Sequence, residues 1–139
     1  MSDVVDRLRR AAPEAFEGSA VRFAYLFGSV ARGRPHRGSD IDVAVYLDPP
    51  PADPVEAALA LAGRLATASG LAGIDLVVLN AAPLRLQGRI LRERVVIFSC
   101  DEPSRVAYES RTFREFVDFE LHAVALDRAA LRRMASGAE

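Results

Sequence analysis

The sequence predicts an α/β (α+β) domain in which a short mixed sheet of about four strands carries helices packed on one face, followed by a long helical segment. Half of the 139 residues are hydrophobic, which is enough for one buried core. Short β-branched runs alternate with segments whose apolar residues recur at helical spacing. We therefore expect a single domain over residues 1–139, with a core at about 18–100 and a C-terminal helical segment at about 102–135.

The first third of the chain should hold a helix and two strands. The helix is expected to begin at Ser2 or Asp3, and Pro13 to interrupt it. A mostly apolar, alternating run predicts a buried strand over residues 20–27. A second strand is expected over residues 40–47, where β-branched residues follow Gly38-Ser39 and precede a run of prolines.

The middle of the chain predicts a helix and then a third strand. Asp53 is placed to cap the helix, Pro54 to occupy its first position and Gly70 to end it. The segment 73–80 is apolar and alternating, which is typical of a strand. A helix should therefore connect the second and third strands.

The last third is expected to be mainly helical. Residues 83–93 predict a short helix, residues 94–99 predict a fourth strand, and Asp101 should cap a helical segment that runs towards Met134. Because this segment exceeds a normal globular helix, we expect it to kink or divide and to extend beyond the sheet. Its apolar stripe would then be available to a partner protein. The stripe consists of Phe113, Phe116, Val117, Leu121 and Val124.

A Gly-Ser pair ends the first predicted strand. Gly28 would allow close backbone approach, and Ser29 could cap a short helical turn. The free N–H groups of such a turn, together with the Ser29 hydroxyl, can bind the oxygens of a triphosphate. Arg32, Arg34 and Arg37 add positive charge nearby, and Arg32 is the candidate for a nucleotide contact.

Two acids open the second predicted strand, ten residues after the Gly-Ser pair. Asp40 and Asp42 should lie on one face of that strand, with Cα atoms roughly 6.5 Å apart. Paired carboxylates repel each other and lose hydration, which is costly unless cations lie between them. Two such acids can share a site or hold two Mg²⁺ ions about 4 Å apart, an arrangement used in phosphoryl and nucleotidyl transfer.

Asp75 interrupts the apolar pattern of the third predicted strand. An acid in such a strand conflicts with burial, and conflicts of this kind often mark functional residues. If the third strand lies beside the second, about 4.8 Å away, Asp75 can reach Asp40 and Asp42. The sequence alone does not establish that adjacency.

The combination of Gly-Ser, a ten-residue spacer and Asp-x-Asp resembles the signature of the nucleotidyltransferase superfamily related to DNA polymerase beta. The forms Phe-Gly-Ser-Val-Ala-Arg-Gly and Ser-Asp-Ile-Asp-Val look like the minimal nucleotidyltransferases. More closely, the chain resembles the MntA-like antitoxins that are paired with HEPN-domain toxins. This resemblance covers most of the chain and implies the nucleotidyltransferase fold.

The resemblance also implies roles for the motif residues. Gly28 and Ser29 would contact the phosphates of ATP. Asp40 and Asp42 would bind two Mg²⁺ ions. Asp75 would complete the site beside them, as a metal ligand or as the group that takes the proton of the attacking hydroxyl.

The activity implied is Mg-dependent transfer of AMP from ATP to a tyrosine of a cognate HEPN ribonuclease toxin, which inactivates the toxin. The chain would then be the antitoxin of a type VII toxin–antitoxin pair and would form a hetero-oligomer with the toxin. Two alternatives remain open: a non-catalytic antitoxin that only masks its toxin, and a nucleotidyltransferase that acts on a small hydroxylated molecule. A ribonuclease role for this chain is disfavoured, because Arg32 and His36 are one residue too close for the Arg-x4-6-His motif.

Composition narrows the possible partners and compartments. A net charge of −1 gives no sign of binding to nucleic acid or to an anionic membrane. The single cysteine, Cys100, excludes an internal disulfide and fits a reducing cytoplasm. No apolar run approaches the roughly 20 residues that span a bilayer, and the N-terminus lacks the apolar core of a signal peptide. We therefore expect a cytoplasmic protein with no direct nucleic-acid or membrane contact.

Overall fold

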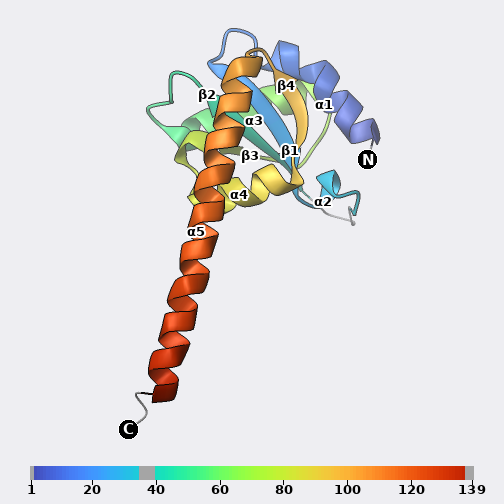
Figure 1. Cartoon of the computed structure of the whole chain (residues 1–139). Coiled ribbons are helices and arrows are strands. Elements are labelled where there is room, and N and C mark those ends of the chain that lie inside the picture. The colour runs from blue at the N-terminus through green and yellow to red at the C-terminus, as the bar shows by residue number, and fades with distance from the viewer. Residues whose placement is uncertain (1, 35–39, 137–139) are drawn as a thin grey trace.

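The computed structural model describes residues 2–34 and 40–136, in which four strands form one mixed sheet (Figure 1). The strand order is β3-β2-β1-β4. β1 is antiparallel to β2 and β4, whereas β2 and β3 are parallel. The predicted mixed sheet is therefore confirmed. The strands are β1 (Val21–Phe27), β2 (Ile41–Leu47), β3 (Ile74–Val78) and β4 (Val95–Ser99).

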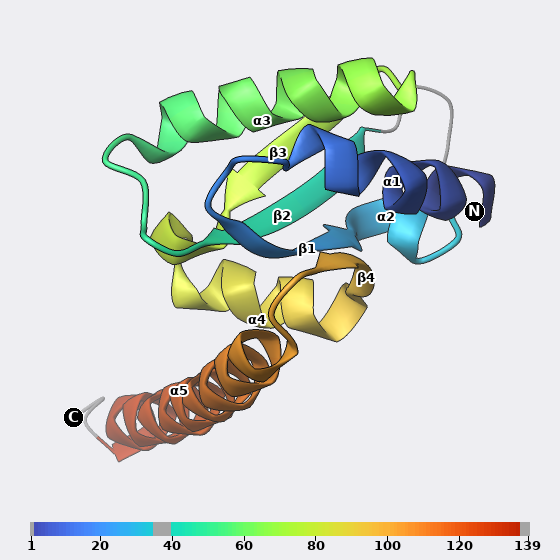
Figure 2. The ribbon, with the colours of Figure 1, turned by 90° about the horizontal axis from the view of Figure 1, so that it is seen from above.

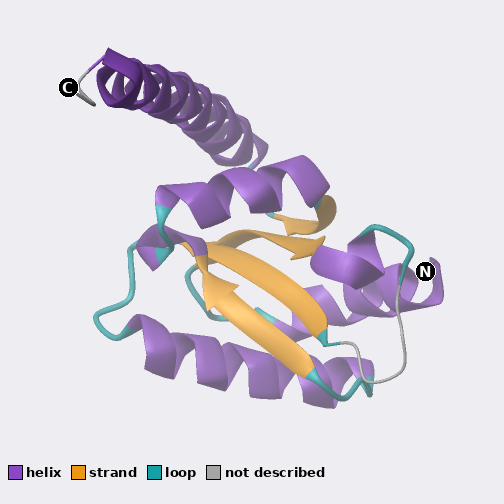
Figure 3. Cartoon of the chain, turned by 90° about the horizontal axis from the view of Figure 1, so that it is seen from below, coloured by secondary structure: helices purple, strands orange, loops and turns teal. Residues whose placement is uncertain are grey.

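Helices cover both faces of the sheet, and the prediction that they pack on one face is wrong (Figures 2 and 3). Two helices lie against one face, and α4 and the first part of α5 lie against the other. The reason is that β1 is apolar on both faces, with Leu26 on one side and Tyr25 on the other, so that both faces need a cover. The helices are α1 (Ser2–Ala15), α2 (Gly28–Ala31), α3 (Pro54–Ser69), α4 (Leu84–Glu93) and α5 (Glu102–Ser136), with a short 3-10 turn at Leu79–Ala81.

The sheet separates two hydrophobic clusters. Leu8 and Leu65 bring α1 and α3 into the first cluster, and both side chains are fully buried. Phe23 of β1, Ile90 of α4 and Tyr108 of α5 belong to the second. Each such side chain stabilises the fold by about 1.5–3 kcal/mol when it is fully buried. The two clusters therefore hold β1 and β2 rigidly between layers of helix.

Local sequence signals place most helix ends correctly. The Asp53 side chain accepts the Glu56 N–H at 3.1 Å, and Gly70 ends α3 with a left-handed φ of 72°. The expected interruption at Pro13 is wrong, because α1 continues to Ala15. Pro13 is exposed in the last turn, while Ala15 beside it is buried, so packing on the core outweighs the hydrogen bond that proline removes.

α5 is one continuous helix of 35 residues. The expectation that this segment divides is therefore wrong. Asp101 caps it, since its side chain accepts the Ser104 N–H at 3.1 Å. Tyr108, Thr112 and Phe116 are buried in its first half, and beyond them the helix extends away from the sheet (Figure 1). None of the described helices combines the length and the apolar character needed to cross a membrane. The large apolar side chains that α5 exposes are Val106, Phe113, Val117, Phe119, Leu121, Val124, Leu126, Leu131 and Met134.

A partly buried network fastens the start of α5 to the sheet. The Tyr25 hydroxyl donates to Glu109 Oε2 at 2.6 Å, and the same carboxylate pairs with Arg94 at 3.1 Å and with Arg105 at 2.8 Å. Burial alone would raise the pKa of Glu109, but the hydrogen bonds from Tyr25 and Arg105 and the nearby positive charges outweigh burial and lower that pKa. Glu109 is therefore ionised and stabilising at neutral pH.

We expect Glu109→Ala to lower the free energy of unfolding by about 1–3 kcal/mol, because the Tyr25 hydroxyl and two arginines lose their acceptor. Glu115→Ala, on the exposed side of the same helix, is the matched control and should change stability by less than about 0.5 kcal/mol. Urea denaturation measures both. Because the folded pKa of Glu109 is lowered, its contribution exists above the unfolded pKa and is lost as pH falls through the folded pKa. If Glu109→Ala remained less stable than the unaltered chain in strong acid, the ionised Glu109 carboxylate would not be the source of the stabilisation.

Candidate functional site

Asp42 and Asp75 lie side by side on the parallel strands β2 and β3. They are directly paired in register, so both side chains project to one face of the sheet, the face that carries Ala44 and Tyr46. Asp40 directly precedes β2 and belongs to the same end of the sheet. The structure therefore supplies the adjacency of the second and third strands that the sequence alone left open.

The carboxylate of Asp42 carries an electrostatic penalty. Asp42 is partly buried, whereas Asp40 and Asp75 are exposed. Burial raises the pKa of Asp42, and the negative charges of Asp75 and Asp40 raise it further. The positive charge of Arg89 opposes this effect, and Glu93 adds to it slightly. A cation placed among the three acids would relieve the repulsion.

Gly28 ends β1 directly beside Asp42. The preceding residue, Phe27, pairs with Asp42 across the two strands. Gly28 adopts a φ of +79°, in the left-handed region that favours glycine, and a Cβ at this position would overlap Oδ2 of the Asp42 carboxylate. Any larger residue would have to push the turn and the acid apart.

The short helix α2 begins at Gly28, two residues earlier than a Ser29 cap requires, because a helix capped by Ser29 would begin at Val30. Phe27 is the cap residue, in an extended conformation, and no side chain caps the helix, so the predicted capping role of Ser29 is wrong. The left-handed φ of Gly28 lets the chain enter the turn at the end of the strand, which places Ser29 within the first turn. Its partly exposed side chain remains next to Gly28.

Glu93, the last residue of α4, contacts the same turn and was not foreseen from the sequence. Its Oε1 accepts the Gly28 N–H at 3.1 Å, and its Oε2 pairs with Arg32 Nη1 at 2.6 Å. One N–H group of the turn is thus already satisfied, and Arg32 has an acidic partner. A signal for Glu93 did exist, because the helix dipole disfavours an acid at the C-terminal end of a helix.

The structure describes three of the other residues singled out in the sequence, and their side chains are exposed. Arg34 is exposed, and Arg37 and His36 lie outside the described residues. Cys100 directly follows β4, as predicted from its position at a strand end, and is exposed. His122 is exposed on α5.

The chemistry of the donor set fits Mg²⁺. Carboxylate oxygens are ligands that this ion prefers, and the charges of Asp40 and Asp75 act on Asp42. Over residues 2–34 and 40–136, no group of three or more His, Cys, Asp or Glu side chains is already arranged to hold a metal ion. Mg²⁺ usually binds through one or two carboxylates together with substrate phosphates. A complete set of protein ligands is therefore not required for these acids to bind Mg²⁺.

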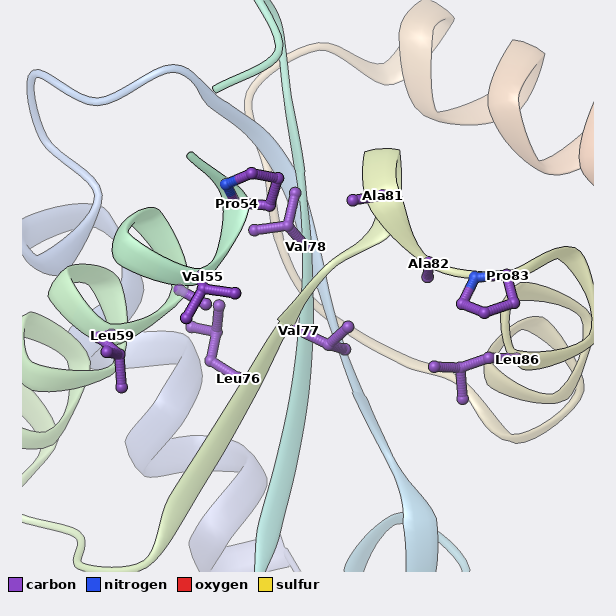
Figure 4. A pocket seen from close by; sticks show the side chains of 11 residues that line it. Pro54, Val55, Leu59, Leu76, Val77, Val78, Ala81, Ala82, Pro83 and Leu86 are labelled. Carbon is purple, nitrogen blue, oxygen red and sulfur yellow. The ribbon is translucent and has the colours of Figure 1, made fainter. Parts of the chain in front are cut away.

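An apolar pocket of about 330 Å³ lies at the outer edge of β3 (Figure 4). Val55 and Leu59 of α3 lie on one side of it, Val77 lies on the strand, and Pro83 and Leu86 lie on the other side. The residues that line it include none of the predicted site residues. Because its lining is apolar, the pocket suits an apolar group and not a phosphate.

Residues 12–103 match the protein family described as Polymerase beta, Nucleotidyltransferase. The match covers most of the chain and contains the Gly28–Ser29 turn together with the three acids. The chain therefore belongs to the polymerase beta nucleotidyltransferase family, and the nucleotidyltransferase fold predicted from the motif is confirmed.

Solved toxin–antitoxin structures contain chains similar to this one along almost its whole length. One is a toxin–antitoxin complex with AMP-PNP (25% identity, 96% of this chain and 97% of that chain covered, TM-score 0.58). Another is the toxin–antitoxin MntA-HepT (20% identity, 94% and 98% covered, TM-score 0.59). A third is tri-AMPylated Shewanella oneidensis HEPN toxin in complex with MNT antitoxin (20% identity, 97% and 99% covered, TM-score 0.57). The latter two likenesses concern the fold alone. No match is found among curated proteins.

Proposed function

We propose that this chain is the antitoxin of a type VII HEPN toxin–antitoxin pair and that it transfers AMP from ATP to a tyrosine hydroxyl of its cognate toxin. The observation that carries the proposal is the convergence of the Gly28 turn with Asp42 and Asp75 at one end of the sheet. The similar structures with AMP-PNP and with an AMPylated toxin support ATP as the nucleotide and a protein as the acceptor.

The Gly28–Ser29 turn would hold the phosphates of ATP. The close approach of Gly28 to Asp42 brings the turn and the acids to one place, so a triphosphate bound at the turn would lie beside the carboxylates. The Ser29 hydroxyl and the backbone N–H groups not taken by Glu93 would donate hydrogen bonds to the phosphate oxygens. Arg32 would reach a phosphate only by sharing or leaving its ion pair with Glu93.

Asp40, Asp42 and Asp75 would hold two Mg²⁺ ions, which when bound neutralise phosphate charge and lower the pKa of the attacking hydroxyl. Asp75 lies on the edge strand and is exposed, so a hydroxyl carried by another protein can approach it. Asp75 would accept the tyrosine proton as the tyrosine oxygen bonds to the α-phosphorus. The bond between the α-phosphorus and the bridging oxygen breaks, and pyrophosphate leaves with its electron pair.

The exposed apolar residues of α5 would form the surface that binds the toxin. Most of them, from Val117 to Met134, follow the last buried residue of α5, Phe116, and the helix extends beyond the sheet there (Figure 1). Apolar surface of this extent often marks a protein–protein interface. The same surface supports the second candidate function, in which the antitoxin neutralises its toxin by masking it without chemistry.

A labelling experiment distinguishes these two functions. The purified complex with its HEPN partner, incubated with Mg²⁺ and ATP labelled at the α-phosphate, should transfer label to the partner and raise the partner's mass by at least one AMP. Asp40→Ala should abolish labelling and still co-purify with the partner, while Asp6→Ala, an exposed acid of α1, should label normally. Neutralisation of the toxin without any label would favour masking. Labelling that survives in Asp40→Ala would refute the assigned site.

A further inference from the structure

Three arginines form a row along the exposed face of α4. Arg85, Arg89 and Arg92 follow one another at intervals of four and three residues, which places them on one side of the helix over about 10 Å. They line a hollow of about 580 Å³ together with Phe116 and Glu120 of α5. All three are exposed, and within the described parts of the chain none forms an ion pair with a carboxylate. The hollow therefore carries a net positive charge, since three arginines and one acid, Glu120, line it.

Aromatic rings of α5 hold two of these arginines in place. The guanidinium of Arg85 lies 5.5 Å from the centre of the Phe119 ring, and that of Arg92 lies 5.4 Å from the centre of the Phe116 ring. A guanidinium stacked on a ring keeps its N–H edges free to donate hydrogen bonds. Arg85 and Arg92 are thus ordered donors on either side of Arg89, which lowers the entropy cost of binding an anion to them.

The row leads to the Gly28 turn. Glu93 follows Arg89 by four residues, so the two share a face of α4, and Glu93 binds the Gly28 N–H at 3.1 Å. The positive charge of Arg89 also acts on Asp42. Arg32, in contrast, is paired with Glu93 at 2.6 Å. Among residues 2–34 and 40–136, Arg89 is therefore a cation one helical turn from Glu93 that forms no ion pair with an acid.

We infer that Arg89 binds the β- and γ-phosphates of the nucleotide and remains bound to the leaving pyrophosphate, and that Arg85 and Arg92 extend this anion site along α4. This inference rests on the proposed function and names a residue outside the Gly-Ser and Asp-x-Asp motifs. Two Mg²⁺ ions would balance the four negative charges of Asp40, Asp42, Asp75 and Glu93, so a bound triphosphate would gain from a further cation supplied by the fold. Arginine suits this role, because its planar fork can donate two hydrogen bonds to one phosphate.

Nucleotide binding to the purified chain, measured by calorimetry without any acceptor, tests the inference. Arg89→Gln should weaken the binding of ATP and of inorganic pyrophosphate by about 10–100-fold, because a charge-assisted hydrogen bond is lost. The affinity for AMP, which lacks the β- and γ-phosphates, should change less than twofold. The affinity of Arg89→Lys for ATP should lie between those of Arg89→Gln and the unaltered chain. Arg114→Gln, an exposed arginine of α5 outside this hollow, is the matched control and should bind all three ligands normally.

Comparison of the variant with the unaltered chain distinguishes failure of this inference from failure of the proposed function. If the unaltered chain binds ATP and Arg89→Gln binds it equally well, the role of Arg89 is refuted and the proposed function stands. Equal losses for ATP and AMP in a variant with an unchanged circular dichroism spectrum would place Arg89 away from the β- and γ-phosphates and would also refute the inference. If the unaltered chain binds no ATP, both proposals fail.

Discussion

Asp42→Asn should abolish nucleotidyl transfer and at the same time make the protein more stable. A neutral amide cannot replace a carboxylate that offsets phosphate charge through a bound cation, an effect of several kcal/mol, so we expect transfer to fall by at least about 10³-fold. The same change removes a negative charge that is partly buried and repelled by Asp75 and Asp40, and it keeps the size of the side chain. We therefore expect the midpoint of thermal unfolding to rise by a few degrees.

The pH dependence of this gain follows from the raised pKa of Asp42. An acid whose pKa is higher in the folded state binds its proton more tightly there, so its protonation favours folding in acid. That advantage is lost as pH rises through the folded pKa, above which the ionised carboxylate destabilises the fold. Asp42→Asn has no such charge. The difference in thermal midpoint between the variant and the unaltered chain should therefore widen from acid to neutral pH in the presence of a chelator.

Two comparisons control this result. Asp6→Asn, which alters an exposed acid of α1, should change neither transfer nor the thermal midpoint. Addition of Mg²⁺ should raise the midpoint of the unaltered chain more than that of Asp42→Asn, because a ligand stabilises the state that binds it. A lower midpoint for Asp42→Asn in metal-free buffer would show that the carboxylate is not under repulsion.

Much of the acidic cluster could be placed from the sequence, because strand periodicity decides which side chains share a face. Asp42 lies opposite the buried face of β2, formed by Ile41, Val43 and Val45, as the alternation predicts. The position of Asp75 beside it could not be obtained in this way, because strand pairing depends on the whole topology and not on local pattern. Only the resemblance to a known family supplied that adjacency.

Local pattern gave no signal for Arg89 and only one for Glu93, which is an acid at the C-terminal end of a helix. Both lie on the polar face of α4, and a polar face rich in arginine is typical of a solvated helix. Glu93 contacts Gly28, and the charge of Arg89 acts on Asp42, because α4 packs on the second face of the sheet, which was expected to be uncovered. Because helices were expected on one face only, the sequence did not predict that these two residues lie near the Gly28 turn and Asp42.

Gly28→Ala should destabilise the fold and disable the site together. The left-handed φ of Gly28 costs an alanine about 1 kcal/mol, and the overlap of its Cβ with the Asp42 carboxylate adds to this, so we expect a total loss of about 2–4 kcal/mol in urea denaturation. The turn and the acid can then no longer approach each other. Displacements of about 1 Å between reacting groups can lower a rate by about 100-fold, so we expect transfer to fall by at least this factor.

Gly18→Ala separates the two contributions. Gly18 has a φ of +73° and open space where a Cβ would lie, so the substitution should cost about 1 kcal/mol from the backbone alone. In an Asp42→Ala background the overlapping carboxylate is absent and only the Cβ of residue 42 remains, at 3.3 Å, so Gly28→Ala should then cost little more than Gly18→Ala. The coupling between positions 28 and 42 in this double-mutant cycle measures how closely the turn approaches the acid. If Gly28→Ala costs the same in both backgrounds, the contact between the Gly28 turn and Asp42 does not constrain the site.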